Sequence, residues 1–234
     1  MLNSDINASA LIMYHHSKTG RLDMTAHEVI NAPGEGMFTL GAGRAFSELD
    51  KDTLVSIMLE TDSSVEFLDP RILVKSRSHL VWYTAPQHID VLFKGEMHNA
   101  PIPGLVYIAE SGKPLRCFAF KGKKRPTPET PLFFAPFGNY YKNGTFCVGN
   151  AIVPKNNTIA DIPGWEQFVL QCTNTHMGGV QVLKSHKVYE DVIAFYKALS
   201  DTKAKIFPPR ELVKALNLKT QLTLNDALKP GASK

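Results

Sequence analysis

Short apolar runs alternate with turn residues between residues 66 and 150 of the chain. The runs are rich in aromatic and β-branched side chains, which favour strands. The predicted strands are Leu80–Thr84, Asp90–Phe93, Leu105–Ile108, Leu115–Phe120 and Leu132–Phe134. Because the links between these runs are short, as at Ser111–Pro114, the pattern predicts an antiparallel meander. Three prolines within Arg125–Pro131 predict an extended connection, since proline cannot donate a ladder hydrogen bond in a central strand.

The period of the apolar positions changes after residue 160. Apolar residues now recur three and four positions apart, which predicts helices over Trp165–His176 and Val188–Leu199. Pro208–Leu216 begins with prolines at positions where a helix tolerates them and predicts another helix, and Asn225–Lys229 a last short turn. Since the strands precede the helices, the predicted fold class is α+β, with helices packed on an antiparallel sheet.

The first 65 residues have a different pattern. The glycine-rich stretch Pro33–Gly43 lacks the spacing of a dinucleotide-binding fingerprint, so it predicts turns in a small β-rich extension. Asp50–Glu60 has apolar residues at helical spacing and predicts a helix. We therefore expect two parts, an N-terminal β-rich extension over residues 1–65 and a larger domain over residues 66–234.

Composition and charge narrow the functional classes. With 44% hydrophobic and 21% charged residues, the chain falls in the globular range. The 26 basic and 22 acidic residues leave a net charge of +4, an excess too small to require a polyanion, so the charge balance permits a nucleic-acid partner but does not call for one. The basic run Lys121–Arg125 predicts a solvated turn. The beginning of the chain does not resemble a signal peptide and no run is long enough to span a membrane, so we expect a cytoplasmic protein without a membrane partner.

The three cysteines differ in the chemistry that their surroundings suggest. Their odd number and wide spacing argue against a disulfide framework and for a reducing compartment. Cys117 lies in a predicted strand and Cys172 in a predicted helix, so both are expected to pack in the core. Cys172 and His176 offer only two ligands, so we expect no metal site. The chain shows no cofactor-binding motif.

Cys147 follows a strong turn signal at the end of the segment Phe137–Cys147. Asn143 and Gly144 both accept positive φ, so they predict a tight ribbon that presents Cys147 just beyond the turn. A thiol reachable by another macromolecule can form a covalent intermediate. The alternative is a small buried hydrophobe, the usual role of a free cysteine.

The same segment resembles the catalytic motif of ubiquitin-conjugating enzymes. In that family a His-Pro-Asn triplet precedes the catalytic cysteine, and here Asn139, Tyr141 and Gly144 stand eight, six and three residues before Cys147, in the register of the family. Phe137 and Gly138 replace the His-Pro pair. That departure resembles the prokaryotic ubiquitin-conjugating-like family D, in which the usual histidine is absent and another lies after the cysteine. This family includes a component of the PRTRC system of plasmids and other mobile elements.

The resemblance covers most of the chain and implies a UBC-like fold. Further similar segments are Arg125–Leu132, Ala135–Phe137, Gly144–Gly149, Trp165–Phe168 and, more weakly, Leu80–Thr84 and the N-terminal region. It implies that Cys147 accepts a small ubiquitin-like protein from a ThiF-like activating enzyme as a thioester and passes it on. Asn139 would donate its amide to the oxyanion, worth about 3 kcal/mol of transition-state stabilisation; alternatively, it holds the loop by bonding the backbone.

His176 best matches the downstream histidine of that family. It would orient the loop or act as a base, since an imidazole titrates near neutral pH; alternatively, it is a helix cap or a packed side chain. Two other functions remain open at this point. One is a non-catalytic module with the same fold that binds the ubiquitin-like protein without a thioester, as the missing His-Pro pair suggests. The other is a DNA-binding factor of plasmid maintenance.

Overall fold

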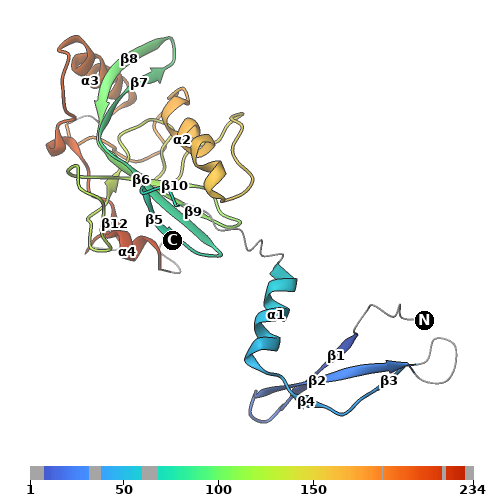
Figure 1. The fold of residues 1–234 in the computed structure, drawn as a ribbon. Helices are drawn as coiled ribbons and strands as arrows, with labels where there is room; N and C mark the ends of the chain where they lie inside the picture. Colours follow the sequence, from blue (N-terminus) through green and yellow to red (C-terminus); the bar gives the residue numbers. More distant parts are fainter. Residues whose placement is uncertain (1–7, 32–37, 60–67, 186, 218–219, 230–234) are drawn as a thin grey trace. The chain divides into compact units, whose positions relative to one another are not determined.

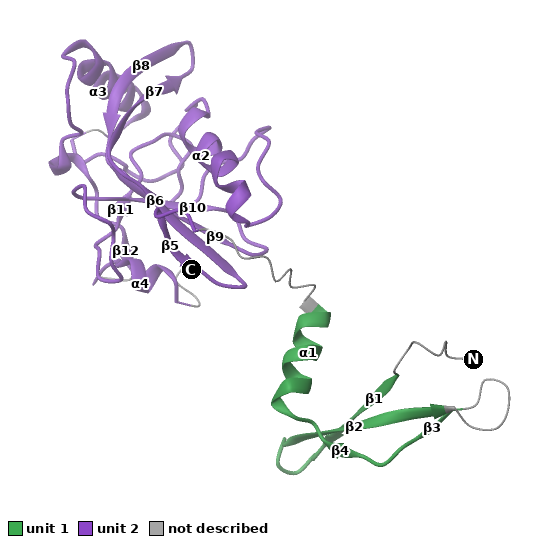
Figure 2. Ribbon diagram, in the orientation of Figure 1, with its two compact units in different colours: residues 1–66 green, residues 67–234 purple. Residues whose placement is uncertain are grey.

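The computed structural model describes residues 8–31, 38–59, 68–185, 187–217 and 220–229. The chain divides into two compact units, Met1–Glu66 and Phe67–Lys234 (Figure 2). The predicted boundary near residue 65 and residues 33–37 of the glycine-rich stretch lie outside the described residues. Each unit is described by itself.

The first unit contains a small antiparallel sheet and one helix. Strand β2 pairs with β1, β3 and β4, so it is the central strand. The elements are β1 (Ser9–His15), β2 (Leu22–Asn31), β3 (Phe38–Leu40), β4 (Arg44–Ala45) and α1 (Glu48–Leu59). The helix expected over Asp50–Glu60 is thus present and begins two residues earlier. Among the described residues of this unit, Ala26 is the one buried apolar side chain.

The second unit is built on a five-stranded antiparallel sheet in the order β11-β10-β9-β6-β5 (Figure 1). Its strands are β5 (Ile72–Lys75), β6 (His79–Thr84), β9 (Gly104–Glu110), β10 (Arg116–Phe120) and β11 (Phe133–Phe134). The predicted runs supply all of these except β5. Strands β9 and β10 are almost wholly buried, so the centre of the sheet is also the centre of the core.

The order of the strands departs from the predicted meander at one hairpin. Strands β7 (Gln87–Phe93) and β8 (Glu96–Ile102) pair with each other as a separate two-stranded sheet, and the strands on either side of them in the chain, β6 and β9, pair directly. The sequence did not predict β8 because Asn99 and Pro101 lower its strand propensity. The hairpin contacts α2 (Ile162–Gln171) through β7 and α3 (Tyr189–Asp201) through β8.

The helices agree only in part with the predicted periodicity. Helix α3 confirms the prediction over Val188–Leu199. Helix α2 begins at Ile162 and ends at Gln171, so the prediction over Trp165–His176 was wrong in its last five residues; Cys172 is already extended, with ψ 139°. The short turn expected at Asn225–Lys229 is α4 (Leu224–Ala227). None of the helices in the described ranges is long and apolar enough to cross a membrane.

The helix predicted over Pro208–Leu216 was wrong. Only a 3₁₀ turn, η2 (Pro209–Glu211), forms there. The next residues are extended because they pair with the chain at and just before β11. Phe134 N donates to Val213 O (2.9 Å) and Ala215 N to Leu132 O (3.1 Å). Pairing between distant segments therefore overrides the local helical pattern. The remaining short elements are η1 (Ile159–Asp161), β12 (Leu216–Asn217) and β13 (Thr220–Gln221).

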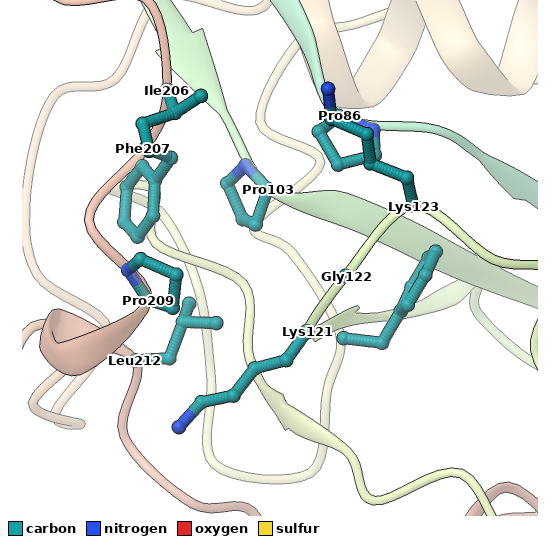
Figure 3. Close-up of a pocket in the computed structure, with 10 residues that line it drawn as sticks. Pro86, Pro103, Lys121, Gly122, Lys123, Ile206, Phe207, Pro209 and Leu212 are labelled. Atoms are coloured by element: carbon teal, nitrogen blue, oxygen red, sulfur yellow. The ribbon is translucent and has the colours of Figure 1, made fainter.

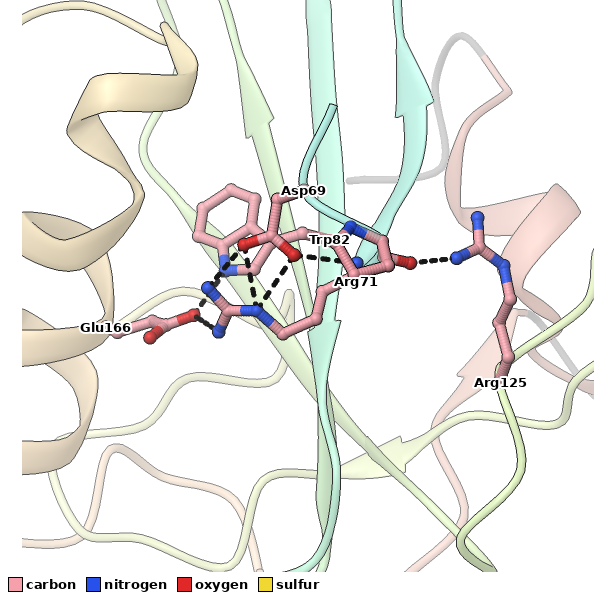
Figure 4. Close-up of polar contacts among 6 residues, drawn as sticks. Asp69, Arg71, Trp82, Arg125 and Glu166 are labelled. Atoms are coloured by element: carbon pink, nitrogen blue, oxygen red, sulfur yellow. Dashed lines mark hydrogen bonds and ion pairs between the residues drawn. The ribbon is translucent and has the colours of Figure 1, made fainter. Parts of the chain in front are cut away.

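An ion-pair network joins α2 to the edge of the main sheet. Figure 4 shows the Arg71 guanidinium between two carboxylates: its Nη2 lies 2.7 Å from Asp69 Oδ2 and its Nη1 lies 2.6 Å from Glu166 Oε1. Trp82 Nε1 also donates to Glu166 Oε1 (3.0 Å), and the Trp82 side chain is fully buried against Tyr107. Hydrogen bonds from Arg71 lower the pKa of Asp69. The Glu166 carboxylate therefore pairs with the Arg71 guanidinium and accepts a hydrogen bond from the buried Trp82 indole.

We predict that Glu166→Ala lowers the free energy of unfolding by about 2 kcal/mol, because the buried Trp82 N–H loses its acceptor. Glu166→Gln keeps an acceptor and loses only the charge, so its effect should be smaller. The matched control is Asp201→Asn, which removes the exposed pair with Lys197 and should cost less than about 0.5 kcal/mol. Urea denaturation of the full chain measures all three, and equal midpoints for E166A and D201N would contradict the prediction.

Candidate functional site

The segment before Cys147 folds as the predicted tight ribbon. Tyr141 N donates to Thr145 O (2.9 Å) and Gly144 N to Tyr141 O (2.9 Å). Asn143 Oδ1 accepts from both the backbone N (3.1 Å) and the hydroxyl (2.8 Å) of Thr145, and Gly144 has φ +91°, a value that favours glycine. The turn residues thus close the ribbon two residues before Cys147, whose side chain is half-buried.

The ribbon lies directly on strand β10. Cys117 N donates to Gly144 O (2.8 Å), and the buried Tyr140 hydroxyl donates to Cys117 O (2.8 Å). A Cβ at Gly144 would fall 2.4 Å from the Phe118 ring, so only glycine allows this approach. The Cys117 side chain is fully buried, which confirms its expected place in the core, and burial raises its pKa well above the usual value.

Aromatic packing fixes the position where the family triplet has a histidine. Phe137 is buried, and its ring lies 6.5 Å from that of Phe146. The Phe146 ring in turn meets the Tyr140 ring edge-on at 5.1 Å. The Tyr196 hydroxyl of α3 donates to Pro136 O (2.7 Å) just before the loop. The loop is therefore ordered by apolar contacts here, with one hydrogen bond from α3.

Asn139 joins the loop to the segment after α2. It has φ +56°, which asparagine tolerates better than most residues. Its side-chain Nδ2 donates to Thr173 O (2.9 Å), while Oδ1 accepts from Thr175 N (3.0 Å) and His176 N (3.3 Å). Its backbone N donates to His176 O (2.7 Å), and its O accepts from Cys147 N (2.7 Å). The amide contacts are those of the structural role considered above, and the oxyanion role stays a prediction.

The segment that receives Asn139 is itself fixed by the β7–β8 hairpin and α3. Asn174 donates to Leu92 O of β7 from both its backbone N (2.8 Å) and its side-chain Nδ2 (2.9 Å). The Tyr189 hydroxyl of α3 donates to Asn174 O. A Cβ at Gly138 would fall 2.9 Å from Asn174 Cβ, so this glycine permits the close approach of the two segments. The hairpin that interrupts the meander thereby positions the site.

The predicted site residues are brought together through backbone contacts. His176 lies beside Asn139, and its exposed ring Nδ1 is 3.0 Å from the Thr175 hydroxyl. Among the described residues, no hydrogen bond joins the His176 ring to Cys147. Interaction with Cys147 raises the pKa of Tyr141, so this phenol lies within electrostatic reach of the thiol. Sequence reasoning used Tyr141 only to set the register, although its spacing from Cys147 could have marked it as a site residue.

A recess of about 360 Å³ opens next to the loop. Its walls include Phe146 and Val148, the two neighbours of Cys147, and Trp165 of α2, with Lys113 and Lys155 also among the lining residues. Trp165 Nε1 is buried and has no hydrogen-bond partner among the described residues. The described residues contain no cluster of three or more His, Cys, Asp or Glu side chains that could hold a metal ion.

Comparison with known families places this loop in context. The family model described as Prokaryotic E2 family D matches residues 51–215, more than half of the chain, and includes the loop and the segment that holds it. The chain belongs to prokaryotic E2 family D. Membership makes it a ubiquitin-conjugating-like protein and, in general terms, suggests contacts with an activating enzyme and a ubiquitin-like protein. Comparisons with curated proteins and with solved structures gave no match.

We predict that Asn139→Ala lowers the free energy of unfolding of this E2 family D protein by about 1–3 kcal/mol, because the three backbone groups bonded by the amide lose those bonds and alanine disfavours positive φ. Asn139→Asp keeps the acceptor and loses the donor to Thr173 O, so it should cost less. Asn150→Ala, at an exposed position three residues after Cys147, is the control. Thermal and urea unfolding measure the series, and an N139A protein as stable as N150A would contradict the structural role.

A second prediction concerns the titration of Tyr141. A Cys147 thiolate accepts a hydrogen bond from the neutral phenol and repels the phenolate, so both effects favour the protonated tyrosine and raise its pKa. Cys147→Ala should therefore lower the pKa of Tyr141 towards its ordinary value of about 10. NMR titration of protein labelled with ¹³C at the tyrosine ring measures this shift, with Tyr141→Phe to assign the signal. Superimposable titrations with and without Cys147 would show that the two side chains do not interact.

Proposed function

We propose that this protein carries a ubiquitin-like protein as a thioester on Cys147. The observation that carries the proposal is the position of this thiol: it is half-buried just beyond a closed ribbon, and its backbone N–H is bonded to Asn139, in the register of the family motif. A recess lined by Phe146 and Val148, the sequence neighbours of Cys147, lies beside the loop. Membership in prokaryotic E2 family D supports the same reaction class.

The proposed reaction consists of two acyl transfers. In the first, the Cys147 thiolate attacks the thioester carbonyl that links the ubiquitin-like protein to the activating enzyme; the new C–S bond forms and the activating enzyme leaves as a thiolate. In the second, an acceptor amine attacks the Cys147 thioester, an amide forms, and Cys147 is released as a thiol. Each step conserves the acyl group and needs no oxidant or metal.

The proposed partners are a ThiF-like activating enzyme and a small ubiquitin-like protein of the same system. We also propose that this system is the PRTRC system of plasmids and other mobile elements, as the sequence resemblance implies.

In the first transfer the developing oxyanion needs a hydrogen-bond donor. Asn139 Nδ2 carries two N–H groups and uses one of them for Thr173 O, so its second N–H could serve the oxyanion, and Tyr141, whose pKa is raised by interaction with Cys147, is a second candidate donor. We therefore include Tyr141 together with Asn139 in the proposed catalytic site. We propose that His176 positions the loop through its backbone.

A non-catalytic module that only binds the ubiquitin-like protein is the second candidate. The observation that favours it is the Asn139 amide, whose oxygen and one of whose two N–H groups are engaged by the neighbouring segment in a structural role. The two candidates differ in whether a covalent adduct forms.

The test mixes the purified full chain with the cognate activating enzyme, the ubiquitin-like protein and ATP, and resolves the products on a non-reducing gel. We expect an adduct that is removed by reductant and absent in Cys147→Ala, whereas Cys147→Ser should give an ester that resists reductant. Cys172→Ala is the matched control and should form the adduct at the wild-type level, since Cys172 lies at the end of α2 outside the loop.

Two further outcomes separate the candidates. If the activating enzyme is demonstrably charged and no adduct forms, the thioester function is wrong. Saturable binding of the free ubiquitin-like protein under those conditions would then support the non-catalytic module. An adduct that persists in Cys147→Ala but disappears in Cys172→Ala would show that Cys172 is the acyl carrier, and the assignment to Cys147 would be wrong.

A further inference from the structure

A small apolar pocket lies in the second unit, apart from the Phe137–Cys147 loop. It opens between the turn that joins β8 to β9, the turn after β10 and the segment before η2, and it has a volume of about 160 Å³ (Figure 3). The lining residues are Pro86, Pro103, Phe120, Lys121, Gly122, Lys123, Ile206, Phe207, Pro209 and Leu212. None of them belongs to the loop or to the segment that holds it, so a ligand here would leave Cys147 accessible.

The walls of the pocket are rigid and apolar. Phe120, Phe207 and Leu212 are buried in the main core, so their positions are fixed by packing. Pro103 is also buried, and proline offers no backbone N–H. A Cβ at Gly104 would fall 2.4 Å from the Phe120 ring, so the backbone of β9 closely confines that ring. The pocket is therefore preformed and suited to a hydrocarbon group.

The mouth of the pocket is cationic. Lys121 and Lys123 are exposed on either side of Gly122; in Figure 3, Lys123 extends towards Pro86 and Lys121 towards Leu212. The Lys121 ammonium lies 4.8 Å from the centre of the Phe133 ring, which favours its position there. One more exposed cation, Lys205, adjoins a lining residue in the sequence, and Arg210 beside Pro209 is paired with the buried carboxylate of Glu211 (4.0 Å). None of the lining residues has a carboxylate, so the site attracts anions.

We propose that this pocket binds an acidic segment of a partner protein that inserts one bulky apolar side chain between its carboxylates. The volume sets the size of the anchor, since an apolar cavity of about 150 Å³ holds a benzene ring. A phenylalanine or leucine side chain thus fills the pocket. Carboxylates on either side of that anchor reach Lys121 and Lys123, which extend in different directions from the turn. In this proposal the basic run Lys121–Arg125, predicted from the sequence to be a solvated turn, contributes to a recognition surface.

The experiment measures binding of defined peptides to the full chain by fluorescence anisotropy at low and physiological salt. The probe is fluorescein-labelled Gly-Glu-Asp-Phe-Asp-Glu-Gly, and its companions replace the phenylalanine with alanine or all four acids with lysine. We expect saturable binding of the probe with a dissociation constant of about 10–100 μM, weakening as salt rises. Either companion should bind at least about tenfold more weakly. No saturation below about 1 mM would overturn the proposal.

Variants of the protein separate the pocket from general electrostatic attraction. Lys123→Glu and Ile206→Asp should each weaken probe binding about tenfold or more. Ile206 is 65% exposed, so its replacement should leave the fold intact, which circular dichroism checks. Lys124→Glu is the matched control: it makes the same charge change in the same exposed run without lining the pocket, and it should change binding by less than about threefold. If K124E weakens binding as much as K123E, the run attracts acidic peptides without the pocket and the proposal is wrong.

Discussion

The arrangement around Cys147 depends on one side chain, the carboxamide of Asn139. It donates to one backbone carbonyl and accepts from two backbone N–H groups and the Thr175 hydroxyl of the segment 173–176, so a single side chain satisfies four polar groups of an irregular segment. Backbone groups in such a segment have no ladder to pair with and must find partners elsewhere. The backbone carbonyl of Asn139 also accepts from Cys147 N, so the same residue fixes both the segment 173–176 and the backbone of Cys147.

The wider fold supports this contact. The hairpin β7–β8 provides Leu92 O as the acceptor for Asn174, and α3 provides a tyrosine hydroxyl to the same residue. Beneath the loop, Phe137, which stands where the triplet of ubiquitin-conjugating enzymes has its histidine, makes an apolar contact with Phe146. The contact between these two rings involves no titratable group. This part of the loop should therefore keep its geometry across the pH range in which a histidine changes charge.

The sequence predicted the parts of the fold that are governed by local pattern. The central strands, the helix α3 and the ribbon at Asn143-Gly144 each follow from periodicity or turn chemistry within about ten residues. The errors arise where distant segments pair. The segment after Pro208 reads as helix but is extended because it bonds to the strand end at Leu132–Phe134. The hairpin β7–β8 leaves the meander because helices cover it, and no local signal reports that contact.

The candidate site shows the same division. The resemblance to the family motif marked Cys147 and Asn139 as candidates, and the structure connects them by a backbone hydrogen bond. The partners of the Asn139 amide lie more than thirty residues further along the chain, so their identity depends on tertiary structure and could not be predicted. The ring of His176 was proposed to orient the loop, yet it is the backbone of this residue that bonds to Asn139.

The environments of the three thiols explain why one of them is the candidate for chemistry. Burial raises the pKa of Cys117 well above its usual value and also raises that of Cys172, so burial disfavours the reactive thiolate at both positions. Cys117 in addition lies within the central sheet, where no macromolecule can reach it. Cys147 and Cys172 are both half-buried, and Cys172 lines a recess of its own, so access alone does not separate them. What separates them is their surroundings. Cys147 follows the closed ribbon in the register of the family motif, its backbone N is bonded to Asn139 O, and it raises the pKa of Tyr141, whereas Cys172 ends α2 and burial raises its own pKa.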